Sequence, residues 1–430
     1  MTSSPRFSLG ETTRQTGMLF SAQTISMFFG FCASVIQARW MEPAEMGRFA
    51  FCLSVVVVLS IFFEFGISSA GARVLALSRD RDRERQALGA LMLLTVAISI
   101  AFSLFIAAVA TPIDLIFSKN VRWLLAAAAA LAFFHPFQTF IEQSCQGLNQ
   151  IRRLSIFQLL MSGSYLLGLI VLAALRSLTA GAALGAYLAG IGVASLWTLA
   201  RMRPKFSGAS SYIRLTLKET RGYGFNLYLA RISGMVSSRA DQLAIGYFLT
   251  DTAPLGVYAI AQKFSNPIAM ISRALAITRY RAFARLARVP GRILKWNAAA
   301  IVAASVALVV AGPLLLKFVF PKYTQASSLL LPFAVMNVFI GLFQPYNIFL
   351  GSHGRGAELR NIVLIVGITT IAALLVVVPR YGITSAAWTG AGAMALDCVL
   401  HLLYYRRFIG TLGDGEGLKG ENGYFGTTSA

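Results

Sequence analysis

The stretch ALGALMLLTVAISIAFSLFIAAVAT, residues 87–111, runs for 25 positions without a charged side chain. A helix needs about 20 apolar residues to cross the hydrocarbon core of a bilayer, so this stretch is long enough. Lipid offers no hydrogen-bond partners, and the backbone of such a segment must form its hydrogen bonds internally, as a helix does. The stretch therefore predicts a membrane-spanning helix.

The same pattern recurs along the chain of 430 residues, of which 57% are hydrophobic and 13% are charged. A soluble protein carries about a quarter of its residues charged. Charged residues and Pro or Gly breaks separate twelve apolar stretches, which predict an all-α polytopic membrane protein with about twelve transmembrane helices. The stretches are residues 18–38, 46–70, 87–111, 121–146, 154–176, 178–201, 223–249, 254–278, 294–319, 327–351, 361–379 and 383–405.

The positions of the Lys and Arg residues predict the orientation of these spans. With twelve spans, 26 of the 38 Lys and Arg residues lie on the side of both termini, 8 lie on the opposite side, and four lie within spans. Positive residues concentrate in cytoplasmic loops, so we expect both termini in the cytoplasm. The net charge of +21 is explained by this topology, and no nucleic-acid partner is expected.

The chain also repeats itself at offsets of 204 to 209 residues. The clearest match is MGRFA at Met46–Ala50 with LGVYA at Leu255–Ala259. The offset divides the spans into two sets of six, so the two halves should be related by a pseudo-twofold axis along the membrane normal, with a transport site between them. We expect an N-terminal lobe, a cytoplasmic linker, a C-terminal lobe and a disordered cytoplasmic tail, over residues 1–205, 206–222, 223–407 and 408–430.

Cations in the end turns of the predicted spans are counted with the adjoining loops; four cations lie deeper within the spans, all of them in the second lobe: Arg231, Arg239, Lys263 and Arg273. A charge inside a membrane span is costly and indicates a functional site by default. On a helix over residues 223–249, Arg231 shares one face with Ser238 and Gln242. We expect Arg231, Arg239 and Lys263, together with Ser238 and Gln242, to bind an anionic group in the cleft. Structural ion pairing is the alternative reading of these cations.

The predicted spans also contain acids, which are candidates for ion pairs or for coupling to a proton or a sodium ion: Glu64, Glu142, Asp241 and Asp397. Asp241 and Lys263 fall at similar depth on neighbouring spans, so we expect them to pair. The 209-residue offset places Glu64 opposite Arg273, and these two residues are candidates for a cytoplasmic gate. The scattered cysteines and histidines predict no metal site, and no other cofactor is expected.

Four segments resemble the polysaccharide transporter family of the multidrug/oligosaccharidyl-lipid/polysaccharide exporter superfamily. Two of them lie in the first half: LGETTRQTGMLFSAQTISMFFGFCASVIQARWMEPAEMGRFAF, which begins at Leu9, and FEFGISSAGARVLAL, which begins at Phe63. The other two lie in the second half: GFNLYLARISGMVSSRADQLAIGYFLTDTAPLGVYAIAQKF, which begins at Gly224, and VVVPRYGITSAAW, which begins at Val376. The resemblance covers about residues 8 to 407 and implies a flippase of the bacterial inner membrane. Such a protein moves undecaprenyl-diphosphate-linked oligosaccharide by alternating access, for O-antigen or exopolysaccharide synthesis. Its expected partners are the lipid-linked substrate, bilayer lipids, a polysaccharide polymerase and other assembly proteins.

Two other functions remain open. A cation-coupled antiporter of small molecules from the same superfamily would need an acidic cavity, whereas the second lobe is rich in buried cations. A membrane-embedded polymerase or ligase would need a large external loop, and the predicted external loops have about 4 to 12 residues. The sequence contains no GxxxxGK[ST] loop for ATP. The spacing of Asp80 and Asp82 matches the acid pair of some glycosyltransferases, but an alternating charge run typically extends a helix into solvent. We therefore expect that the protein is not an enzyme.

Overall fold

The computed structural model describes the backbone of residues 9–78, 80–283, 286 and 288–413. Side chains are described for these residues except 9–16, 222–223, 226–227, 229–230, 233, 235–237, 270, 273–282 and 411–413. The regular backbone in these ranges is helical, which confirms the all-α class. The longer helices are α1 (Leu9–Trp40), α2 (Pro43–Phe62), α3 (Ile67–Ala76), α4 (Arg81–Phe117), α5 (Arg122–Ala132), α6 (His135–Gly147), α7 (Ile151–Ala174), α8 (Ala180–Met202), α9 (Ala209–Glu219), α10 (Phe225–Phe248), α11 (Ala253–Phe283), α12 (Gly291–Val319), α13 (Ser327–Ser352) and α14 (Gly356–Gly413).

Every predicted span falls on one or two of these helices. Within the described ranges, nine helical stretches are long and apolar enough to cross a membrane. The span expected at 46–70 is divided into α2 and α3, and the span expected at 121–146 is divided into α5 and α6. The spans expected on α10 and α11 carry charged residues and are not among the nine stretches. The chain is a multi-pass membrane protein.

The last two predicted spans lie in α14, which reverses direction at Gly382. This residue has φ 64° and ψ −148°, a backbone conformation that favours glycine. Ile362 and Val366 of the first half pack in one apolar cluster with Ala393 and Leu400 of the second half. In a straight helix these residues would be tens of ångströms apart, since each residue adds about 1.5 Å. Therefore α14 is a hairpin of two helices.

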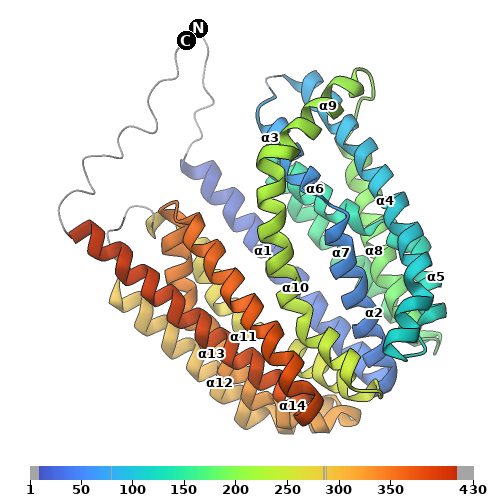
Figure 1. Ribbon diagram of the computed structural model, residues 1–430, viewed down its shortest axis with the longest axis vertical. Helices are drawn as coiled ribbons and strands as arrows, with labels where there is room; N and C mark the ends of the chain where they lie inside the picture. Colours follow the sequence, from blue (N-terminus) through green and yellow to red (C-terminus); the bar gives the residue numbers. More distant parts are fainter. Residues whose placement is uncertain (1–8, 79, 284–285, 287, 414–430) are drawn as a thin grey trace.

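The helices form two groups that converge at one end of the molecule (Figure 1). At that end a single apolar core joins both groups, from Phe49 and Leu184 of the first to Tyr258, Phe333 and Ala386 of the second. At the opposite end, which carries α9, each group has a separate core. The α9 end is the predicted cytoplasmic end, and we call the other the outer end. Two lobes are thus packed together mainly at their outer end.

The repeated motifs meet at the outer end. A Cβ atom on Gly47 would lie 1.8 Å from the carbonyl oxygen of Thr252, and one on Gly256 would lie 2.0 Å from the carbonyl oxygen of Pro43. These distances are far below van der Waals contact, so only glycine fits at either position. Gly47 and Gly256 are separated by the 209-residue offset of the repeat. The equivalent ends of α2 and α11 therefore cross in direct backbone contact.

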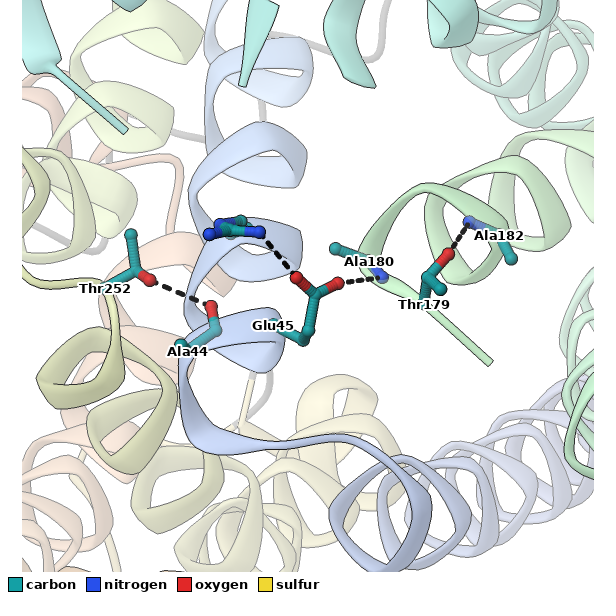
Figure 2. A network of polar contacts seen from close by, with 7 residues as sticks. Ala44, Glu45, Thr179, Ala180, Ala182 and Thr252 are labelled. Carbon is teal, nitrogen blue, oxygen red and sulfur yellow. Dashed lines mark hydrogen bonds and ion pairs between the residues drawn. The ribbon is translucent and has the colours of Figure 1, made fainter. Parts of the chain in front are cut away.

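Polar contacts reinforce this crossing (Figure 2). Glu45, in the first turn of α2, accepts hydrogen bonds from Arg48 at 2.7 Å and from the backbone N–H of Ala180 at 2.8 Å. The hydroxyl of Thr252 donates to the carbonyl oxygen of Ala44 at 3.0 Å. Lys119, between α4 and α5, donates to the carbonyl oxygens of Leu249 and Thr250. Loops of both lobes are thus held together at the outer end.

At the α9 end, one helix of the second lobe contacts the first lobe. Gly66 has φ 75°, and a Cβ atom there would lie 2.2 Å from the carbonyl oxygen of Gly224. The hydroxyl of Tyr228 on α10 donates to the carbonyl oxygen of Phe62 at 3.0 Å. The expected linker, residues 206–222, contains α9 and the start of a π-helical segment, Thr220–Gly224, that leads into α10. Residues 414–430 of the expected tail lie outside the described ranges, while 408–413 continue α14.

Substitution of Gly256 by valine should open the outer end, because the side chain would collide with the Pro43 carbonyl group. Cys52 reports this change, since it is 0% exposed within the shared core. In a variant whose only cysteine is Cys52, a membrane-impermeant maleimide added from outside should label the Gly256→Val protein but not its parent. Gly392→Val is the matched control, because a Cβ atom there meets nothing within 4 Å. An unlabelled Cys52 in a folded Gly256→Val protein would contradict the proposed crossing.

Candidate functional site

A polar cavity of about 240 Å³ lies between the first lobe and α10. A break at Phe133–Phe134 separates α5 from α6, and Pro136 is the second residue of α6, where a proline costs no helical hydrogen bond. His135, Gln138 and Glu142 then face the cavity from one side of α6, three and four residues apart. The rest of its polar lining comes from other helices and includes Glu64, Ser68, Thr95, Tyr187, Arg231 and Arg239.

An ion pair between the lobes forms one wall of this cavity. The guanidinium of Arg231 donates to both carboxylate oxygens of Glu64, at 2.8 and 3.0 Å. Glu64 lies in the turn between α2 and α3, where Phe65 and Gly66 both have positive φ and end the helix. Glu64 was expected to face Arg273, but its partner is Arg231; the side chain of Arg273 lies outside the described residues. Arg231 thus forms an ion pair with the first lobe, and the binding role expected of it stays a prediction.

The second arginine of this cavity is less completely matched by acids. Arg239 donates to the side-chain oxygen of Gln242 at 3.5 Å and forms no ion pair within the described part of the chain. Glu142 accepts from the side-chain amide of Gln138 at 3.2 Å. The cavity thus contains two guanidinium groups and two carboxylates, with one of each joined directly. In this part of the site, the arginines that were expected to bind an anionic group therefore lie beside an equal number of carboxylates.

A second cavity, of about 320 Å³, adjoins the first and shares Tyr187 with it. It lies between α1, α2, α7 and α11 and is more apolar, with Phe31, Phe49 and Met161 in its lining. Lys263 enters it from α11, with its ammonium group 5.3 Å from the centre of the Phe49 ring. A cation over an aromatic face is held by the ring quadrupole. Lys263 therefore faces the space between the lobes, as expected.

The predicted ion pair between Lys263 and Asp241 is wrong. Lys263 donates to the side-chain oxygen of Gln37 on α1 at 2.8 Å. Asp241 accepts from the hydroxyl of Tyr258 at 2.6 Å and, more weakly, from the side-chain amide of Gln262 at 3.4 Å. The two groups line different cavities, since Lys263 lies between the lobes and Asp241 lies inside the second lobe. Similar depth did not establish that they share a face.

Asp241 belongs to a third cavity, of about 280 Å³, inside the second lobe. Asp397, on the second half of α14, lines the same cavity, together with Gln262 and Thr370. Asp397 is 2.7 Å from the ring nitrogen of His401. The described lining of this cavity contains two carboxylates and no Lys or Arg residue. Two of the four candidate coupling acids are therefore brought together here, apart from Glu64 and Glu142.

The remaining predicted residues of α10 separate into different environments. Ser238 lines the cavity inside the second lobe. Gln242 is buried and bonded to Ser54 of α2 and to Gln262 of α11, so it lines none of the three cavities. The prediction that Arg231, Ser238 and Gln242 form one stripe on the cleft is wrong, because α10 packs against both lobes.

Several residues of the central cavities were missed by sequence reasoning. Within the described residues, the amide nitrogen of Gln37 and the hydroxyl of Tyr165 are buried without a hydrogen-bond partner. Both residues line the cavity that contains Lys263, and Tyr187 lies between the two central cavities. A glutamine within a predicted span was a usable signal, since a polar group in a membrane helix needs a partner.

The family model described as "Polysaccharide biosynthesis protein" matches residues 12–276, more than half of the chain. The chain belongs to this family. The resemblance predicted from the sequence is thereby confirmed, and the matched region includes both central cavities as far as α11. Among curated proteins, none matches the sequence.

Solved structures share the fold of this polysaccharide biosynthesis family member. One is described as "Lipid II flippase MurJ, inward closed conformation", with 12% identity, a TM-score of 0.72 and coverage of 91% of this chain and 88% of that one. Another is an inward-facing multidrug resistance MATE family transporter of the MOP superfamily, with 14% identity, a TM-score of 0.71 and coverage of 93% and 99%. At these identities the likeness establishes the fold alone.

The ion pair between Glu64 and Arg231 should stabilise the observed arrangement of the lobes. Glu64→Gln leaves Arg231 without its acid, and Arg231 is 31% exposed, so we expect a loss of about 1–3 kcal/mol, less than for a fully buried pair. The thermal unfolding midpoint of the purified protein measures this loss. Glu358→Gln is the control, because its pair with Arg355 lies within one helical turn. In the double variant Glu64→Gln/Arg231→Gln, part of the stability lost in Glu64→Gln should be recovered. If the stability losses of the two single variants simply add in the double variant, that result would argue against the ion pair.

Proposed function

We propose that the protein is a flippase that moves undecaprenyl-diphosphate-linked oligosaccharide across the bacterial inner membrane, for O-antigen or exopolysaccharide synthesis. The observation that carries this proposal is the pair of adjoining cavities between the lobes, which present Arg239 and Lys263 in a membrane-spanning protein. Membership of the polysaccharide biosynthesis family supports it. The printed name of the flippase with the same fold, a lipid II flippase, supports transport of a lipid-linked molecule.

The two cavities differ in the chemistry that they offer to such a substrate. A diphosphate group cannot enter hydrocarbon without replacing its water by other hydrogen-bond donors. Arg239, Lys263 and the unpartnered donors of Gln37 and Tyr165 would supply them. The hydroxyl groups of a sugar can form hydrogen bonds with the side chains of His135, Gln138 and Glu142 on α6. We therefore assign the diphosphate to the Arg239 and Lys263 region and the sugars to the α6 side.

The arrangement of the lobes supports alternating access. The lobes are closed against each other at the outer end by the Gly47 and Gly256 crossing and have separate cores at the α9 end. With the α9 end in the cytoplasm, this is a conformation that receives substrate from the inner leaflet. Release to the outer leaflet would require the shared outer core to separate. On this proposal both termini lie in the cytoplasm, and a polysaccharide polymerase and other assembly proteins are the partners.

We place ion coupling at the cavity that contains Asp241 and Asp397. A sodium ion prefers oxygen ligands, and this lining combines two carboxylates with the side-chain oxygens of Gln262, Ser238 and Thr370. A proton on Asp241 is the alternative, because a charged carboxylate is costly in an enclosed cavity whose described lining has no Lys or Arg residue. Glu64 is less suited, because Arg231 neutralises it.

Lys263→Ala and Arg239→Ala should each reduce the export of lipid-linked oligosaccharide by at least about tenfold. Each variant loses one charge-assisted hydrogen bond to the diphosphate, and the free energy of such a bond corresponds to about this factor. The measurement is the amount of oligosaccharide reaching the outer leaflet in a deletion strain that carries each variant. Lys317→Ala is the matched control, since Lys317 is an exposed residue at the end of α12. The amount of folded protein should be equal in all three strains. Unchanged export in both cavity variants would reject the anion site.

The deletion strain also separates the competing functions. A flippase predicts lipid-linked oligosaccharide that accumulates facing the cytoplasm and is released on re-expression. Sensitivity to small organic cations without such accumulation would instead support the antiporter. Accumulation of unpolymerised oligosaccharide on the outer leaflet would support a polymerase or a ligase.

Asp241→Asn should abolish the dependence of transport on an ion gradient while leaving substrate binding intact. Transport into inverted vesicles, with proton and sodium gradients imposed separately, measures this dependence. Glu64→Gln is the comparison variant and should keep the response to the gradient. Transport by the unsubstituted protein that ignores both gradients would remove coupling from the proposal.

A further inference from the structure

A second cluster of arginines surrounds a pocket of about 240 Å³ at the α9 end of the first lobe, away from the central cavities. Arg81 and Arg85 belong to the first turns of α4, Arg153 to the first turn of α7, and Arg201 to the last turn of α8. Three helices thus direct guanidinium groups to one space. The residue Glu84 supplies the one carboxylate of the described lining.

The acids near this pocket are bonded elsewhere. Asp80 caps α4 by accepting from the backbone N–H of Arg83 at 2.7 Å, and Asp82 pairs with Lys205 at 2.8 Å. The lysine ammonium also lowers the pKa of Asp82. The spacing of Asp80 and Asp82 is therefore explained by helix capping and loop attachment. Within the described residues, none of the four pocket arginines has an acid within ion-pair distance.

The pocket is held in shape by contacts beneath it and beside it. Its floor is the packed core of the first lobe, in which Leu88 and Met202 are almost fully buried. The loop after α8 lies directly on α4, since a Cβ atom on Gly89 would be 2.1 Å from the carbonyl oxygen of Lys205. The guanidinium of Arg153 is oriented by a 2.6 Å hydrogen bond to Gln150. The arginines are therefore brought together by rigid elements rather than by flexible loops.

The pocket lies at the depth of lipid head groups. The guanidinium of Arg201 lies 5.4 Å from the ring centre of Trp197, and tryptophan prefers the membrane interface. Earlier in α8, Val193 and Leu196 are 53% and 60% exposed, as expected for residues that face lipid tails. Along α8, exposed apolar surface therefore gives way to the cationic pocket toward the end of the helix. An anionic group that reaches this pocket can keep its acyl chains on the apolar side.

We propose that this pocket binds the phosphodiester group of an anionic phospholipid of the inner leaflet. Four arginines against one glutamate give a net positive charge, and guanidinium groups bind phosphate oxygens with paired hydrogen bonds. Basic pockets between transmembrane helices on the cytoplasmic side are suited to anionic head groups. The site is separate from the substrate cavities and does not depend on the proposed transport function.

Trp197 provides a local test of this binding. In the full chain, Trp40, Trp123, Trp296 and Trp388 are replaced by Phe, so that Trp197 is the only tryptophan. The purified protein, in nonionic detergent, is titrated with phosphatidylglycerol brominated near the head group. This lipid should quench Trp197 fluorescence at about a tenfold lower mole fraction than brominated phosphatidylcholine does. Equal quenching by the two lipids would overturn the proposal.

Two double variants and one single variant show whether the pocket causes the preference for phosphatidylglycerol. Arg81→Gln/Arg85→Gln should remove the preference for phosphatidylglycerol, and Arg85→Gln alone should reduce it by about fivefold, the effect of one basic residue near a membrane surface. Arg288→Gln/Arg292→Gln, at the same end of the second lobe and exposed, should leave the preference unchanged. A preference that survives in Arg81→Gln/Arg85→Gln overturns the assignment.

Inorganic phosphate distinguishes the lipid from a soluble ligand. If the lipid is bound through both its head group and its chains, millimolar phosphate should leave the quenching by phosphatidylglycerol in place. Complete displacement by millimolar phosphate would overturn the lipid assignment in favour of a free phosphate. The thermal unfolding midpoint of each variant, measured in the same detergent, confirms that the compared proteins are folded.

Discussion

The contact between the backbones of Gly47 and Gly256 is the constraint on which the arrangement of this molecule depends. A side chain at either position would collide with a carbonyl oxygen of the other lobe, so the two helix ends approach each other only because both residues are glycine. This approach brings the outer halves of the lobes into one apolar core, and it leaves the inner halves with separate cores. The cavities lie where the shared core ends. A small change at the crossing would therefore alter the space available to a substrate many residues away.

The polar groups of the interior are distributed among three cavities with different chemical characters. The cavity beside α6 contains both acids and arginines, the cavity around Lys263 is largely aromatic and apolar, and the cavity inside the second lobe is acidic. Charge is neutralised locally in the first of these, through Glu64 and Arg231. Lys263 thus lies in a different cavity from Asp241 and Asp397, whereas Arg239 shares its cavity with Glu64 and Glu142. On the proposed function, the lysine that would bind the diphosphate is therefore kept apart from the carboxylates that would bind a cation.

The sequence was sufficient for the fold and insufficient for the detail of the site, for physical reasons. Long uncharged runs such as residues 87–111 have few alternatives to a membrane helix, and the repeated motifs MGRFA and LGVYA each contribute a glycine to the contact between the lobes. Helical periodicity failed on α10, because it assumes one polar face, whereas Arg231, Ser238 and Gln242 each contact a different part of the molecule. Depth alone failed for Asp241, since Tyr258 was the nearer partner. Rotation about the helix axis, and competition among several partners, can be judged only in three dimensions.

The divided attachment of α10 has a mechanical consequence. Near its first residues the helix is fastened to the first lobe by Gly66, Tyr228 and the Glu64 carboxylate, while further along it borders α14 of the second lobe. Because α10 is attached to both lobes, the lobes cannot rotate apart freely. Either α10 detaches from one lobe, or it bends between its two points of attachment. The π-helical turn at Thr220–Gly224 adds one residue to the helical repeat just before α10. Conversion of this turn to regular α-helix would change the length of the segment that leads into α10 without breaking the helix.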